Sequence, residues 1–285
     1  MIHHWLRTIL AGVVAICLLG VTGPATSQTP PEREGTRNEM ASLAWQRGPA
    51  EAKIGKMATL KMAEGQAFLD APNTRRFLEL NRNPPRDNHY TLVGGDGTWF
   101  AVFYFEDSGY VKDDEKLDSD TLLKSLQESD GPSNKERQRL GMPALHTVGW
   151  AVPPHYDSAT KRLEWGMRLR TAANHEIVNY TIRLLGRRGI VHATLVCDPE
   201  NLTRDVADFK TALTSYAFVP GETYAEFRAG DKVAEYGLAA LVLGGAAAVA
   251  TKSGFIKAIG KFIVIGVVGL GSAVMAFFRR FRRSS

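Results

Sequence analysis

The sequence predicts an α+β fold in which an antiparallel meander over residues 145–198 carries packed helices and is followed by a C-terminal transmembrane helix. Residues 163–170 alternate strictly between apolar and polar side chains, which is typical of a strand with one buried face. Short polar turns at 172–175 and 187–188 separate this run from two further strands. Apolar residues recur at helical spacing over 201–216, which indicates a helix packed on the sheet.

The alternation also predicts the register of the meander. An even-numbered loop within 172–175 places apolar side chains opposite one another in three pairs: Leu163 with Leu184, Trp165 with Ile182, and Met167 with Tyr180. A two-residue turn at Arg187-Arg188 extends this apolar face by three more pairs: Tyr180 with Leu195, Ile182 with Ala193, and Leu184 with Val191. A slip of one residue would move a whole set of apolar side chains to the other face, so we expect this register.

The same register defines a polar row on the opposite face of the meander. It aligns Glu164, Arg183 and His192, and the next row contains Gly166, Thr181 and Thr194. An acid, a cation and a base side by side are a candidate catalytic centre. The alternative is an exposed ladder of paired charges, which often completes one face of an antiparallel sheet.

Shorter elements flank the meander. Strands are predicted at 58–62, 66–69, 99–105 and 145–152, with Glu64-Gly65 as a hairpin turn between the first two. Asn73 or Thr74 can cap a short helix that ends before the Asn-Pro-Pro at 83–85. The strand over 145–152 should stop at Pro153-Pro154, because proline cannot donate to a sheet ladder.

An acidic stretch over residues 106–120 contains the candidate metal ligands. They are Asp113, Asp114, Asp118 and Asp120, because hard cations prefer clustered carboxylate oxygens. The spacing of the acidic residues does not fit a calcium loop of the EF-hand type. The alternative is that Asp118, Ser119 or Asp120 caps a helix over 122–126, where the helix dipole also favours carboxylates.

The amino terminus has the layout of a secretory signal peptide over residues 1–27. A short positive region ends at Arg7, an apolar run covers 9–21, and small residues precede Gln28, where we expect cleavage. An uncleaved anchor is the alternative, although the apolar run is shorter than a spanning helix of about 20 residues. Residues 28–50 are rich in Pro, Gly and charged groups, so they are predicted to form a linker.

The carboxyl terminus predicts a membrane anchor for a folded domain over residues 51–232. Residues 262–278 are an apolar run of the kind that forms a transmembrane helix, and a basic tail over 279–285 follows. Since positive residues prefer the cytoplasmic side, we expect one span, a cytoplasmic C-terminus and an extracytoplasmic, periplasmic domain. Residues 233–261 are predicted as a small-residue apolar helix and a basic loop. The alternative is that 237–250 also crosses the bilayer.

Small residues in the two apolar segments recur at four-residue spacings, as at Gly244 and Ala248 and at Gly269 and Ala273. Such spacings let helices approach closely, so a homo-oligomer within the membrane is a further prediction. The alternative is that Gly and Ala are simply common in such segments.

The sequence lacks the common catalytic motifs, and its charge does not indicate a nucleic-acid partner. It has no Gly-x-Ser-x-Gly, His-Glu-x-x-His, Gly-x-x-x-x-Gly-Lys or Cys-x-x-Cys, so we expect no cofactor and favour a protein that is not an enzyme. The net charge of +5 comes largely from the arginines of the tail, which the membrane explains, so we expect no nucleic-acid partner. Signal cleavage would leave Cys197 as the one cysteine, on an apolar strand face.

Two sets of short motifs carry a family resemblance. Those in the meander are Gly149-Trp150 with Pro153 and Tyr156, Leu163 with Trp165, Asn179-Tyr180 with Arg183, and Leu185-Gly186-Arg187 with Gly189. Those outside it are Gly109-Tyr110-Val111 with Asp113-Asp114, Asn134 before Arg137, Tyr224, Phe227, Asp231-Lys232-Val233-Ala234 and Tyr236-Gly237-Leu238. Over about residues 48–250 the chain resembles a bacterial family of predicted membrane-anchored proteins of unknown function. The resemblance implies an extracytoplasmic domain with a membrane anchor and supplies no activity. The strand order is also similar to sheet-plus-helix modules of the photosystem-P type, as a fold analogy alone.

These observations favour a non-enzymatic, membrane-anchored domain that binds a partner protein or a component of the bacterial envelope, through surface aromatic residues such as Trp150 and Tyr156. The first alternative is an envelope hydrolase or transferase that uses Glu164, Arg183 and His192. The second is a membrane-associated, oligomeric structural protein that depends on the two apolar segments.

Overall fold

A computed structural model describes residues 31–244 of the 285-residue chain. The predicted signal peptide, transmembrane helix and basic tail lie outside the described residues, as does most of the predicted small-residue helix and basic loop. Within residues 31–244, no helix is both long enough and apolar enough to cross a membrane.

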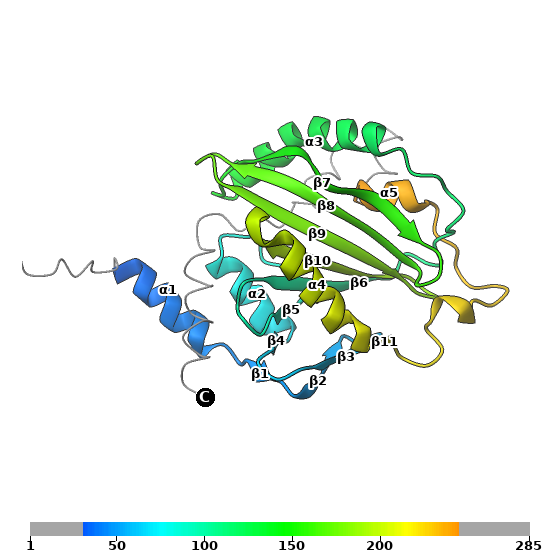
Figure 1. The fold of residues 1–285 in the computed structure, drawn as a ribbon, viewed down its shortest axis with the longest axis horizontal. Coiled ribbons are helices and arrows are strands. Elements are labelled where there is room, and N and C mark those ends of the chain that lie inside the picture. The colour runs from blue at the N-terminus through cyan, green and yellow to red at the C-terminus, as the bar shows by residue number, and fades with distance from the viewer. Residues whose placement is uncertain (1–30, 245–285) are drawn as a thin grey trace, which may run out of the picture.

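An eight-stranded antiparallel sheet forms the centre of the domain, in the order β1-β4-β5-β6-β10-β9-β8-β7 (Figure 1). Its strands are β1 (Gln46–Arg47), β4 (Ala67–Leu69), β5 (Tyr90–Val93), β6 (Phe100–Glu106), β7 (Leu145–Asp157), β8 (Arg162–Thr171), β9 (Glu176–Leu185) and β10 (Ile190–Cys197). A second sheet, in the order β11-β3-β2, contains β2 (Ala50–Ile54), β3 (Ala58–Met62) and β11 (Tyr216–Phe218). The α-helices are α1 (Pro31–Ser42), α2 (Ala71–Leu80), α3 (Ser119–Arg139), α4 (Leu202–Ala212) and α5 (Leu238–Val242). The predicted α+β class with a large antiparallel sheet is confirmed.

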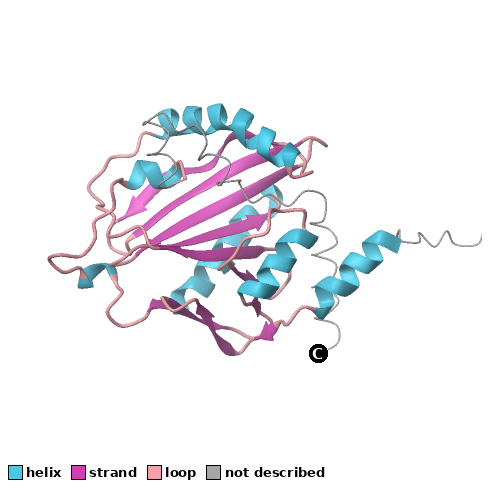
Figure 2. Cartoon of the chain, turned by 180° about the vertical axis from the view of Figure 1, so that it is seen from behind, coloured by secondary structure: helices cyan, strands magenta, loops and turns pink. Residues whose placement is uncertain are grey.

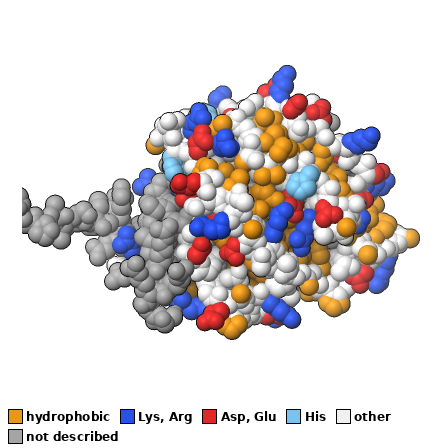
Figure 3. All heavy atoms as spheres, viewed as in Figure 1, with side chains coloured by type: hydrophobic (Ala, Val, Ile, Leu, Met, Phe, Trp, Pro, Cys, Tyr) orange, Lys and Arg blue, Asp and Glu red, His pale blue; other side chains and the backbone are white. Residues whose placement is uncertain are grey.

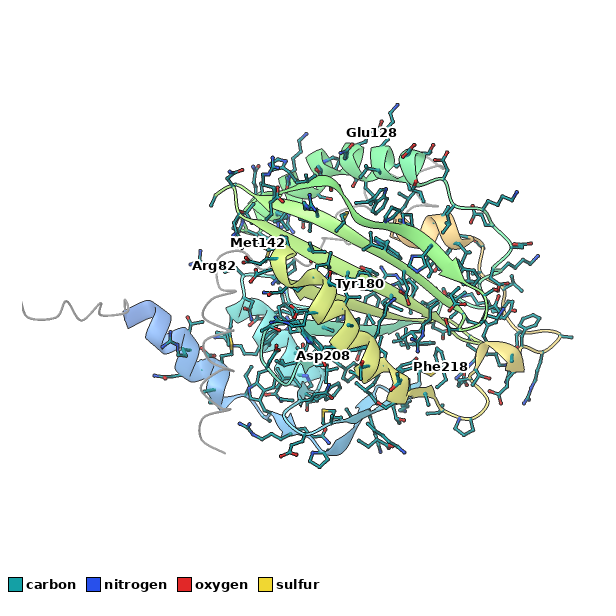
Figure 4. All side chains as sticks on the ribbon, viewed as in Figure 1. Arg82, Glu128, Met142, Tyr180, Asp208 and Phe218 are labelled. Carbon is teal, nitrogen blue, oxygen red and sulfur yellow. The ribbon has the colours of Figure 1, made fainter. Side chains whose placement is uncertain are left out.

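One face of the large sheet, here called the first face, is covered by α4 and by the small sheet (Figure 1). Phe209 of α4 packs edge-on against Trp99, with 5.5 Å between ring centroids. The Trp99 indole Nε1 donates a hydrogen bond of 2.7 Å to Asp208, which Figure 4 labels on α4. These contacts fix the helix across the middle strands. Cys197 is buried in the same core, as its place on an apolar strand face predicted.

Figure 2 shows the molecule from the side of the second face, which helices cover in two separate places. Toward β7, α3 and α5 enclose an apolar cluster that includes Trp165 and Leu241. Toward β4, α2 encloses another apolar cluster that includes Phe77 and Phe100, whose rings are 5.2 Å apart. The strands between these two clusters carry polar side chains on this face.

The second hairpin of the meander has the predicted register, but the prediction for the first hairpin is wrong by one residue. Ile182 lies opposite Ala193, as expected, whereas Trp165 lies opposite Thr181 and not opposite Ile182. Asn174, with φ +60°, donates its backbone N–H to the carbonyl of Thr171. This geometry is a three-residue loop with a left-handed third residue, and an odd-numbered loop shifts the register by one. The shifted register is stable because both faces of the sheet are buried. The apolar side chains of β8 pack on the second face, and those of β9 pack on the first face.

Four flanking elements differ from their predictions. The strands β3 and β4 belong to different sheets, so Glu64-Gly65 is not a hairpin turn. Asp70, and not Asn73 or Thr74, caps α2. The strand β7 continues through Pro153-Pro154, because it is an edge strand whose bulges accommodate residues that do not donate to the ladder. The helix α3 runs 21 residues, far beyond the predicted 122–126, and contains Pro132.

Both ends of the described chain pack onto the domain. Within the predicted linker, α1 contributes the buried Met40, whose carbonyl accepts a hydrogen bond of 2.9 Å from the Trp45 indole. At the other end, Leu238 and Leu241 of α5 are fully buried in the cluster that contains Trp165.

Candidate functional site

A group of polar side chains occupies the second face between the two apolar clusters, and His192 is its fully buried member. We call it the polar cluster, and it consists of Tyr104 and Glu106 of β6, Arg183 of β9, His192 of β10, and Tyr236. His192 lies directly opposite Arg183 on one side and Tyr104 on the other. Three adjacent strands therefore place these groups on one face.

The turn between β9 and β10 determines how closely β10 approaches β6. The backbone N–H of Gly186 bonds the carbonyl of Gly189 at 2.8 Å, which closes the predicted two-residue turn. A side chain at Gly189 would lie only 2.0 Å from the carbonyl oxygen of Glu106. Glycine is therefore required where the turn passes the end of β6, beside the Glu106 carboxylate.

Three rings stack across the polar cluster. The rings of His89 and Tyr104 are 4.5 Å apart, and those of Tyr104 and His192 are 4.1 Å apart, with interplanar angles of 22° and 18°. Nε2 of His192 lies 2.9 Å from a carboxylate oxygen of Glu106, and the hydroxyl of Tyr236 donates to the other oxygen at 2.5 Å. The stack and the carboxylate hold the His192 ring in one orientation.

Both histidines of the stack are neutral at physiological pH. Burial, with the charge of Arg183 as a second cause, lowers the pKa of His192 to about 3. Burial also lowers the pKa of His89 to about 4. Burial opposes the ionisation of Glu106, but His192, Tyr236 and Arg183 outweigh it, and the pKa of Glu106 lies below its ordinary value. Glu106 is therefore a carboxylate beside neutral rings.

Arg183 is the cation of the polar cluster. Its guanidinium carbon lies 4.9 Å from the ring centroid of Trp165, a cation–π contact. Burial lowers the pKa of Arg183, but arginine stays protonated in proteins. Its Nε and Nη1 atoms are buried, and within residues 31–244 neither has a hydrogen-bond acceptor. Buried polar atoms without partners are rare, and the ring nitrogens of His192 are further examples in the polar cluster.

The expected row of Glu164, Arg183 and His192 is not formed. The shifted first hairpin turns Glu164 toward the first face, while Arg183 and His192 face the second. Glu164 accepts a hydrogen bond of 2.6 Å from Tyr180, which Figure 4 labels. It also forms an ion pair of 2.5 Å with Lys210. The expected neighbours Thr181 and Thr194 do lie opposite each other, with 3.5 Å between hydroxyls.

The structure adds Tyr104, Glu106 and Tyr236 to the polar face, which the sequence did not indicate. Tyr104 lies in the strand predicted over 99–105, whose neighbour in the sheet the sequence does not indicate, and Glu106, assigned to the acidic stretch, is the last residue of β6. The pairing of β6 with β10, which joins segments about 90 residues apart, is what brings them to His192.

The acidic stretch serves the local structure. Asp118 caps α3 through the backbone N–H groups of residues 120 and 121, as the capping alternative predicted. Asp113 forms an ion pair of 2.8 Å with Lys161 and accepts a hydrogen bond of 2.6 Å from Tyr156. Asp114 and Asp120 do not join them in a common centre: within the described residues, no group of three or more potential ligands could hold a metal ion.

The two aromatic residues expected to contact a partner have roles inside the domain. The Trp150 indole donates a hydrogen bond of 3.0 Å to the carbonyl of Ser119, which ties β7 to the start of α3. Tyr156 bonds Asp113 as described above. Neither is therefore a freely exposed aromatic side chain.

In the view of Figure 3, acidic and basic groups are interspersed over the first face, without a large field of one sign.

Many of the family-resemblance motifs meet at one end of the sheet. Arg187 and Asp231 form a two-pronged ion pair with both distances 2.7 Å. The backbone N–H of Tyr110 bonds the carbonyl of Lys232 at 2.8 Å, and the Tyr110 ring stacks on Tyr224 at 4.3 Å. These motifs therefore hold the segment before α5 against the turn between β9 and β10.

Comparisons with known proteins give a family match and one structural similarity. The model of the family described as "Protein of unknown function (DUF2167)" matches residues 46–276. No curated protein matches the chain. The fold is similar to the solution structure of cyanobacterial PsbP (CyanoP) from Synechocystis sp. PCC 6803, with 10% sequence identity and a TM-score of 0.35, over 61% of this chain and 92% of that chain.

Proposed function

Since the chain belongs to the family described as a protein of unknown function (DUF2167), we propose a function from its geometry and its sequence pattern. It is a membrane-anchored, extracytoplasmic domain that binds a partner protein or another component of the bacterial envelope without performing chemistry on it. The binding site is the polar cluster on the second face of the sheet.

The observation that carries this proposal is the unsatisfied guanidinium of Arg183. A binding protein requires a polar group that is fixed in place and still has unused hydrogen-bonding capacity. Nε and Nη1 of Arg183 have that capacity within the described part of the chain, and the ring stack beside them is fixed by packing. The placement outside the cytoplasm rests on the signal-like amino terminus and on the arginine-rich tail.

Binding is favoured over catalysis for two reasons. A general base is most effective when its pKa lies near the working pH, whereas the pKa of His192 is about 3. The acid of the expected catalytic row, Glu164, faces the other side of the sheet. The two groups therefore cannot act on one substrate.

In-cell cross-linking of the full-length protein, followed by mass spectrometry of the trapped species, tests the proposal. We expect a heterologous envelope component, trapped again by a signal-bearing version that ends after Gly244. That endpoint keeps α5, whose leucines are buried in the domain. Trapping of the protein itself, by the full-length form alone, would favour the oligomeric alternative. Protection of the domain from protease added outside spheroplasts would contradict the extracytoplasmic placement.

A further inference from the structure

We propose that Arg183 anchors a binding site for a carboxylate group carried by the ligand, on the second face of the sheet between the two apolar clusters. This inference rests on the proposed function and names the chemistry that the site recognises.

The missing hydrogen-bond acceptors of Arg183 reduce the stability of the folded protein. A buried hydrogen-bond donor without an acceptor is destabilising, and a buried cation without a counter-ion is more so. Nε and Nη1 of Arg183 are buried and without acceptors in the described chain, and the Trp165 ring compensates only part of the charge. A ligand oxyanion would supply a missing acceptor and a negative charge.

Within residues 31–244, Arg183 has no carboxylate as a direct partner. Glu106 acts on Arg183 electrostatically, but its oxygens are within 2.9 Å of His192 and 2.5 Å of Tyr236. No ion pair within 4.0 Å joins Arg183 to an acid among the described residues. The segments outside them, residues 1–30 and 245–285, contain no Asp or Glu in their sequences.

The charges around Arg183 favour a ligand group with a single negative charge. Arg183 and Glu106 both act electrostatically on Tyr104, and the oxygens of Glu106 are engaged by His192 and Tyr236. His89 and His192 are neutral, so Arg183 is the cation of the polar cluster that a ligand anion would meet. A carboxylate, with a single negative charge, matches the single positive charge of the guanidinium and can accept from one of its edges. A phosphate dianion would bring a second charge close to Glu106.

The site is held in place before any ligand arrives. Arg183, His192 and Tyr104 are fixed by consecutive pairs across β9, β10 and β6, and Trp165 supports the guanidinium from β8. Side chains on central strands lose little freedom on binding, so even a single carboxylate contact is specific.

Thermal unfolding of the full-length protein in detergent micelles, with sodium acetate titrated against sodium chloride at equal ionic strength and pH 7.5, tests the inference. Acetate should raise the unfolding temperature of the wild type, because a ligand that binds only the folded state stabilises it. Arg183→Gln should lose this response, with at least a tenfold increase in the apparent Kd. Arg82→Gln, which removes the same charge from an exposed position, should keep it.

Three outcomes would overturn the inference: an acetate response that Arg183→Gln retains, no response in the wild type, or a stronger response to inorganic phosphate than to acetate. A second variant guards against a folding defect. In chloride alone, Arg183→Met should be at least as stable as the wild type, because it removes a cation that has buried donors and no ion pair, and it keeps the aliphatic contacts. A clear loss of stability would show that Arg183 has a partner within the protein and would also overturn the inference. If acetate does not stabilise the protein but the cross-linking assay traps an envelope component, the proposed binding function stands and the carboxylate chemistry is wrong.

Discussion

The ammonium group of Lys210 on α4 lies 2.5 Å from the carboxylate of Glu164 on β8, and this ion pair joins the helix to the first face of the sheet. Glu164 is almost completely buried, and it also accepts the hydroxyl of Tyr180. The acid that the sequence placed beside Arg183 therefore acts as an anchor for α4. Its side chain and that of Arg183 point to opposite sides of one sheet.

The first prediction concerns that ion pair. Lys210→Met keeps the aliphatic stem and leaves the Glu164 carboxylate buried with only Tyr180 as a close donor. We expect the free energy of unfolding to fall by about 1 kcal/mol, a modest value because the lysine is partly exposed and screened. Urea unfolding measures the change, and Lys124→Met, at an exposed position on α3, is the matched control. Equal stability of the two variants would remove the anchoring role.

The second prediction concerns the loss of stability in acid. Burial and Arg183 lower the pKa of His192 to about 3, so between its unfolded pKa of about 6.5 and pH 3 the unfolded chain binds a proton that the folded chain does not. This contribution to stability is fully present above pH 6.5 and is lost as the pH falls toward 3. Urea unfolding at pH 7.5 and pH 5.0 should differ by about 2 kcal/mol from this histidine alone.

His192→Gln should reduce that difference, whereas His146→Gln, at an exposed position, should not change it. As a direct check, the His192 ring should stay neutral down to pH 5 in an NMR titration. A ring that protonates near pH 6.5 would show that it is not buried in the stack.

The third prediction concerns the segment after residue 232. Leu241 of α5 is fully buried beside Trp165, whereas Leu140, after α3, is 38% exposed. Leu241→Ala should lower the free energy of unfolding by about 2–5 kcal/mol, and Leu140→Ala should change it little. Thermal unfolding of the two variants in parallel gives the comparison. Equal effects would place α5 outside the folded domain.

The fourth prediction concerns the loop that determines the first hairpin register. Asn174 has φ +60°, a conformation that costs a residue such as alanine about 1–2 kcal/mol. Asn174→Ala should therefore be destabilised by about 1 kcal/mol, and Asn174→Gly should be tolerated. Urea unfolding distinguishes them, and a harmless alanine would mean that the loop has another geometry.

The sequence was sufficient to predict the fold class, the second hairpin and the apolar faces of the individual strands, because these follow from alternation and turn chemistry. It could not relate the face of β8 to that of β9, since both faces of the sheet are buried and an apolar run then fits either one. Asn174 was the available signal for an odd-numbered loop, because asparagine tolerates a positive φ.

The polar cluster was only half predictable for a related reason. Arg183 and His192 face each other across a tight hairpin whose register the glycines at 186 and 189 define. Glu106 and Tyr236 reach them through contacts between segments that are far apart in the sequence, and alternation within one strand carries no information about such pairings. The motifs around Arg187 and Asp231 were found as a resemblance, but their contact was not.

The most direct test of this account compares Arg183→Gln with Glu164→Gln in the in-cell cross-linking assay. Both variants remove one charge from neighbouring strands, but the two side chains lie on opposite faces of the sheet. We expect that Arg183→Gln no longer traps the envelope component and that Glu164→Gln traps it at the level of the wild type. Capture that survives Arg183→Gln and is lost in Glu164→Gln would place the binding site on the first face and contradict the account.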